Sequence, residues 1–148
     1  AEMMWASTIA HNDLLSTGRV GDWASHAIAH QPSALYDLTH GAALSIIFPA
    51  WMKYVYRHDV RRFVQFAVRV WGVEEDFSDP ERTALEGIAR TERFFASAGM
   101  PVTFSQAGIP YSRFGEMADR ATAGDTVKIG NFVPLGRDDI YEIYHMAL

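Results

Sequence analysis

The chain has 148 residues, which is the usual size of a single domain. Its 49% hydrophobic and 21% charged residues exclude a disordered chain, and a net charge of −5 without a lysine or arginine cluster excludes a typical nucleic-acid-binding surface. The absence of cysteine excludes disulfides, thiolate zinc sites and a cysteine nucleophile, and it fits a reducing compartment such as the cytoplasm.

The first half of the chain predicts four helices from its apolar periodicity, at about residues 2–17, 23–36, 41–56 and 60–71. The first of them starts with neither a capping residue nor an initiator methionine, so we expect the chain to be a fragment of a longer protein. Asp22 is expected to cap the second helix, and Pro49 to kink the third. The apolar stretch 42–55 is interrupted by Ser45 and Lys53 as well as Pro49, which makes it too short to span a bilayer.

The second half predicts three more helices, at about residues 80–98, 112–123 and 137–147. Asp79 followed by Pro80 is a typical helix start. Strand signals are weak and confined to residues 102–104 and 126–129. No strand is followed by a glycine-rich turn, so a dinucleotide-binding loop is not expected within this chain. The predicted fold class is all-α, a multi-helix bundle of about seven helices.

Three of the six histidines, His26, His30 and His40, lie within fifteen residues of each other. Imidazole is the commonest metal ligand in proteins and also titrates near neutral pH. His26 and His30 are four residues apart on a predicted helix, so they share one face, with Cβ atoms about 6 Å apart. A helical hairpin would bring His40 level with that face, and Gly41 beside it would allow a close approach. Spacing alone therefore allows a metal site, and equally one or two core histidines in a helix pair.

The residues around these histidines carry a resemblance to a known family. His-x-x-x-His followed ten residues later by His-Gly, with a segment of small and aromatic residues between, resembles the metal-binding stretch of the iron-containing (type III) alcohol dehydrogenases, particularly their butanol-dehydrogenase-like branch. The resemblance extends over the whole chain, and it covers only the helical, dehydroquinate-synthase-like C-terminal domain of that family. The segments that continue it are Met4-Trp5-Ala6-Ser7, Ala50-Trp51-Met52, Phe94-Phe95, Gly99-Met100-Pro101 and Gly108-Ile109.

In that family one aspartate and three histidines hold a divalent metal, iron or zinc, in the cleft between two domains. The resemblance implies that His26 and His40 are two of these ligands. It also implies that His30 is a catalytic, non-ligating histidine beside the substrate and the nicotinamide, suited to proton relay. The family's other two ligands, on an Asp-x-x-x-His helix, have no counterpart here.

The resemblance also implies a domain organisation. We expect residues 1–148 to form a metal-binding C-terminal domain, with the NAD(P)-binding domain preceding Ala1 and absent. The implied activity of the intact protein is hydride transfer between NAD(P)H and a small alcohol or aldehyde, and the isolated chain is expected to be inactive. A homo-oligomer is expected, with neither a nucleic acid nor a membrane as partner. The choices of iron or zinc, NADH or NADPH, and substrate stay open.

Parts of the sequence also fit three other functions, each less well. A zinc metalloprotease needs His-Glu-x-x-His, and Ala27 follows His26, so this function is excluded. An HD-type metal phosphohydrolase would use His30, the pair His58-Asp59, and Asp119. Asp59, however, is already explained as a helix start.

A non-enzymatic helical interaction module is the third alternative. It would use exposed tryptophans, and an apolar surface left bare by a missing domain would favour self-association. The candidate tryptophans are Trp5, Trp23, Trp51 and Trp71. The remaining histidines, His11, His58 and His145, are expected on helix surfaces.

Overall fold

The computed structural model describes residues 1–148, which form seven α-helices and three short 3-10 helices. The predicted all-α class is therefore confirmed. The α-helices are α1 (Glu2–His11), α2 (Ala24–Tyr36), α3 (His40–Val55), α4 (Val60–Trp71), α5 (Pro80–Ser97), α6 (Phe114–Ala121) and α7 (Arg137–Met146). The 3-10 helices are η1 (Leu14–Ser16), η2 (Tyr56–His58) and η3 (Tyr111–Arg113). None of the helices is both long and apolar enough to cross a lipid bilayer.

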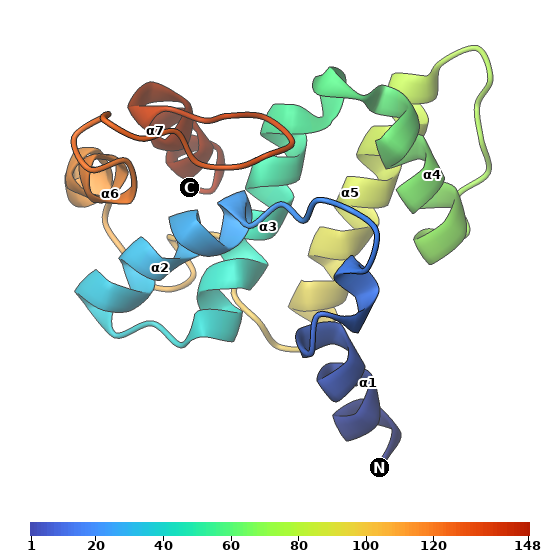
Figure 1. Ribbon diagram of the computed structural model, residues 1–148, viewed down its shortest axis with the longest axis horizontal. Helices are drawn as coiled ribbons and strands as arrows, with labels where there is room; N and C mark the ends of the chain where they lie inside the picture. Colours follow the sequence, from blue (N-terminus) through green and yellow to red (C-terminus); the bar gives the residue numbers. More distant parts are fainter.

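Helix α3 lies in the middle of the molecule. It contacts α2 and α7 on one side and α5 on the other, and α4 packs along α5 (Figure 1). Nine of its sixteen residues are buried, which explains why its sequence is apolar on nearly every side. Helix α1 has no buried residue and extends away from the other helices (Figure 1). The core is therefore built by α2 to α7.

Two aspartates begin helices as predicted. The Asp59 carboxylate accepts the N–H of Arg62 at 3.1 Å, and the Asp79 carboxylate accepts the N–H of Arg82 at 3.0 Å. Each satisfies a backbone donor in the first turn, where no helical carbonyl is available.

Helices α4 and α5 approach each other closely at Gly87. A Cβ atom at this position would lie 2.5 Å from the Cβ of Ala67 and 2.8 Å from its Cα. Glycine is therefore required at residue 87 by the close approach of the two helices, and not by an unusual backbone conformation.

Several sequence-based boundaries were wrong. The first helix ends at His11 instead of residue 17, because Asp13 adopts a left-handed conformation with φ +62°. The weak strand signals at 102–104 and 126–129 produce no strand, in agreement with the predicted all-α class. Of these residues only Ile129 makes a bridge, an isolated antiparallel pair with Leu135. A short β-favouring run without a neighbouring strand has nothing to pair with, so it remains a loop.

Pro32 lies inside α2, although a proline in a helix interior usually breaks or kinks it. Proline has no N–H, so the carbonyl of Ile28, four residues earlier, lacks its helical donor. The hydroxyl of Tyr144 in α7 donates to this carbonyl at 2.9 Å. A tertiary hydrogen bond thus replaces the missing helical one and lets α2 continue to Tyr36.

Candidate metal centre

The three histidines lie on two consecutive helices joined by a tight connection. His26 and His30 belong to α2, which ends at Asp37 in a left-handed conformation with φ +54°. His40 is the first residue of α3. The connection between the two helices, residues 37–39, is only three residues long.

This arrangement brings all three imidazoles together. The ring centre of His40 lies 5.3 Å from that of His26 and 5.1 Å from that of His30. Of the arrangements that the spacing allows, the structure has the helical hairpin, with His40 close to both members of the i, i+4 pair. No group of three or more histidine, cysteine, aspartate or glutamate side chains that could hold a metal forms anywhere in the chain. The cluster could provide two ligands, but not a complete set of four.

His26 is the most enclosed of the three rings. It is half-buried, its Nδ1 atom is buried without a hydrogen-bond partner, and the edge of the Trp23 ring contacts it with ring centres 4.8 Å apart. Burial lowers the pKa of the His26 imidazole, and His40, His30 and His11 lower it further. A neutral imidazole with an unused ring nitrogen fits a metal ion, because metal binding requires the unprotonated ring.

His30 and His40 are exposed to solvent on the same side of the α2–α3 pair. No carboxylate forms an ion pair with any of the three histidines. The face they form is therefore open to a ligand or a further protein segment.

Asp22 attaches the start of α2 to a loop far along the sequence. Its Oδ1 accepts the N–H of Ala24 at 2.7 Å, and its Oδ2 accepts the N–H groups of Asn131 and Phe132 at 3.0 and 2.6 Å. Gly130 allows this approach, since a Cβ there would lie 3.2 Å from Asp22 Oδ2. The N-cap of α2 is Trp23 and not Asp22 as expected, although Asp22 does accept the N–H of the first helical residue. Nothing in the sequence indicated its second contact, which joins positions 110 residues apart.

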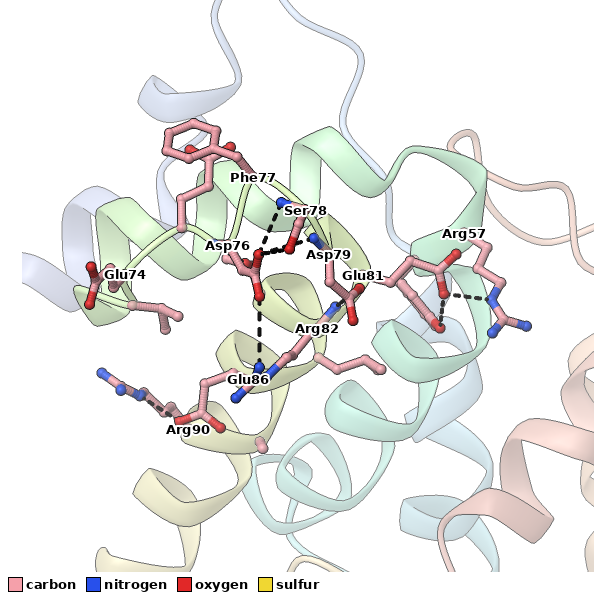
Figure 2. A pocket seen from close by; sticks show the side chains of 16 residues that line it. Arg57, Glu74, Asp76, Phe77, Ser78, Asp79, Glu81, Arg82, Glu86 and Arg90 are labelled. Atoms are coloured by element: carbon pink, nitrogen blue, oxygen red, sulfur yellow. Dashed lines mark hydrogen bonds and ion pairs between the residues drawn. The ribbon is translucent and has the colours of Figure 1, made fainter.

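A separate groove lies away from the histidine cluster. It is open, with a volume of about 1160 Å³, and lies between the α4–α5 loop and α5 (Figure 2). Its arginines are already paired: Arg57 with Glu81, Arg82 with Asp76, and Arg90 with Glu86. The groove contains no histidine, so it does not extend the histidine cluster.

The HD-type alternative is not assembled. His58 lies against the Phe132 ring, Asp59 caps α4, and Asp119 pairs with Arg137 at 2.6 Å. His30 and these residues form no joint site. Each of the last three residues has a structural role instead.

The tryptophans divide into two pairs. Trp5 and Trp23 are exposed, at 64% and 56% of their surface, whereas Trp51 and Trp71 are partly buried. Trp71 donates its indole N–H to Thr91 at 2.8 Å. The proposed interaction surface is thus limited to Trp5 and Trp23, near the N-terminus.

Of the remaining histidines, His11 and His58 are exposed, whereas His145 is partly buried against Phe114 and Tyr141.

The fold and the cluster together define an all-α domain that presents histidines from two adjacent helices on one open face. Residues 1–148 match the C-terminal part of the Fe-containing alcohol dehydrogenase family over their whole length, and the chain belongs to that family.

Curated relatives and solved structures agree with this family. The chain is 37% identical over 145 residues to NADH-dependent butanol dehydrogenase A of Clostridium acetobutylicum, covering 97% of this chain and 37% of that protein. It is 33% identical to the NADPH-dependent aldehyde reductase YqhD of Escherichia coli, covering 99% of this chain and 38% of that protein. The crystal structure of NADH-dependent butanol dehydrogenase A from Thermotoga maritima superposes with a TM-score of 0.91 at 37% identity, over 99% of this chain and 38% of that one. The chain thus spans well under half the length of these relatives.

Proposed function

We propose that this chain is the metal-binding part of an NAD(P)H-dependent alcohol dehydrogenase or aldehyde reductase. In this proposal the nucleotide-binding domain and the remaining metal ligands belong to a part of the protein outside these 148 residues. The observation that supports it best is the position of the His40 ring, 5.3 Å from His26 and 5.1 Å from His30.

His26 and His40 would hold the metal through neutral ring nitrogens. The lowered pKa of His26 favours this role, because its ring remains unprotonated and ready to bind at neutral pH. Imidazole suits both iron and zinc, so this pair does not discriminate between them. When bound, the metal would act as a Lewis acid that polarises the substrate oxygen.

His30 would handle the proton of the substrate. It is exposed on the same face, one helical turn from His26, and can exchange a proton with solvent. During aldehyde reduction it would supply a proton to the product oxygen, and during alcohol oxidation it would accept one. Hydride would come from a nicotinamide bound outside this chain.

Metal titration of the 148-residue chain tests the ligand assignment. We expect Zn²⁺ to shift the imidazole NMR resonances of His26 and His40 at substoichiometric ratios. His26→Ala or His40→Ala should weaken binding by about tenfold or more, at least as much as losing an outer-shell partner, whereas His30→Ala should retain most of it.

His145→Ala is the matched control, because His145 contacts Phe114 and Tyr141 away from the cluster. Equal weakening by His30→Ala and His40→Ala would contradict the separate roles of ligand and proton relay. Unchanged binding in all the cluster variants would contradict the site itself.

The isolated chain should not catalyse the reaction. With two of four ligands and no nucleotide fold, it is expected to leave NADH and NADPH unoxidised in the presence of an aldehyde and Zn²⁺ or Fe²⁺. Absorbance of the reduced nicotinamide measures this directly. Turnover that disappears in His40→Ala would show that the chain is sufficient by itself, against this proposal.

A further inference from the structure

Helix α4 carries three exposed arginines without a carboxylate partner: Arg61, Arg62 and Arg69. Nine of the 13 lysines and arginines in the chain form ion pairs. Three of the four unpaired ones are therefore on α4. In a chain of net charge −5, such a concentration of unpaired positive charge favours an acidic partner.

Two of these arginines border an apolar hollow of about 370 Å³ between α3 and α4. We call it the α4 hollow. Its apolar lining consists of Phe48, Trp51, Met52, Phe63, Phe66 and Val70, and Arg62 and Arg69 lie among them. An aromatic-lined hollow with a cationic rim matches an apolar side chain that is flanked by carboxylates.

The same chain presents such a side chain. Phe77, in the loop between α4 and α5, is 87% exposed, more than any other large hydrophobic residue. Figure 2 shows it in the loop, at the edge of the groove that it helps to line. Glu74 and Glu75 precede it, both exposed and neither in an ion pair.

The loop holds Phe77 in a defined position. The Asp76 carboxylate accepts from the Ser78 N–H at 2.9 Å, the Ser78 hydroxyl at 2.6 Å and the Asp79 N–H at 3.1 Å. The Asp76 N–H in turn donates to Thr83 in α5 at 2.9 Å. Because the loop is already ordered, docking Phe77 would lose little conformational entropy.

We propose that Phe77 of one copy of this chain inserts into the α4 hollow of a second copy, with Glu74 and Glu75 facing Arg62 and Arg69. Phe77 does not line the α4 hollow of its own chain. The contact uses two different surfaces, so it joins copies head to tail. It does not depend on the histidine cluster or on metal.

Sedimentation equilibrium of the 148-residue chain tests the proposal. The mass should rise above that of the 16.6 kDa monomer with concentration, and less so at high salt. Phe77→Ala should raise the dissociation constant by about 30-fold, the effect of losing a hot-spot aromatic. Arg62→Glu combined with Arg69→Glu should do the same.

Mixing the two variants identifies the surfaces. The arginine variant retains Phe77 and the Phe77→Ala variant retains the hollow, so an equimolar mixture should form pairs that neither variant forms alone. Phe94→Ala is the control, since Phe94 is also exposed, at 54%, but lies on α5 outside the hollow. A monomer at all concentrations would overturn the proposal, as would association that survives Phe77→Ala and is lost in Trp5→Ala.

Discussion

Replacing Tyr144 by phenylalanine is expected to lower the free energy of unfolding by about 1–3 kcal/mol, the usual effect of leaving a buried acceptor unsatisfied. Tyr144 is fully buried, and its hydroxyl is the donor to the Ile28 carbonyl. Burial raises the pKa of this hydroxyl far above its usual range, so it remains a donor at all ordinary pH values. Urea unfolding followed by circular dichroism measures the loss.

Pro32 provides the control for this prediction. In a Pro32→Ala background, residue 32 has an N–H that can donate to Ile28 within α2. The same Tyr144→Phe change should then lower the unfolding free energy by less than about 1 kcal/mol, so the double-mutant cycle shows coupling. Equal losses in the two backgrounds would mean that the hydroxyl does not compensate for the proline.

This bond also matters for the candidate site. Ile28 lies between His26 and His30 in α2, and Tyr144 connects this turn to α7. Together with Asp22, which attaches the start of α2 to the loop at Asn131 and Phe132, it holds the histidine helix at two points. The position of the cluster therefore depends on residues more than 100 positions away in the sequence.

Replacing Gly87 by alanine is expected to destabilise the protein by about 3 kcal/mol, at the upper end for overpacking. The added Cβ would lie 2.5 Å from Ala67 Cβ, so α4 and α5 would have to separate. Thermal unfolding should show a midpoint lower by roughly 6–12 °C, given about 2–4 °C per kcal/mol in a domain of this size. Adding Ala67→Gly should recover only part of the loss, because the Ala67 Cα also lies only 2.8 Å away.

Gly41→Ala is the matched control. Gly41 is also helical, but a Cβ there would contact only the Met100 Cε, at an ordinary 3.9 Å. The substitution should leave stability unchanged or raise it by up to about 1 kcal/mol, as expected for alanine in a helix. If both substitutions changed the melting temperature equally, close packing at Gly87 would not be the cause.

Much of the fold could be predicted from local sequence signals. The i, i+3, i+4 pattern of α4 and the capping aspartates Asp59 and Asp79 act within one or two helical turns, and all three were confirmed. The weak strand signal at 126–129 yields only the isolated bridge of Ile129 with Leu135, because a strand needs a partner and no local signal tells whether one exists.

The candidate site likewise combines features that the sequence shows with features that only the structure shows. The i, i+4 spacing of His26 and His30 and their resemblance to a family of metal enzymes were available from the sequence. The sequence left the approach of His40 to both rings as one possibility, and it gave no sign of the bonds that attach α2 to distant residues through Asp22 and Tyr144.

The sequence alone therefore determined that this protein is helical, where most of its helices lie, and which histidines to consider. Only the tertiary structure decided which of them meet, why α2 continues past Pro32, and why Gly87 cannot be larger. The physical reason is the range of the interactions involved. Helix periodicity and capping depend on neighbours within about four residues, whereas a buried carbonyl or a helix crossing is satisfied by whichever distant residue the packing brings to it.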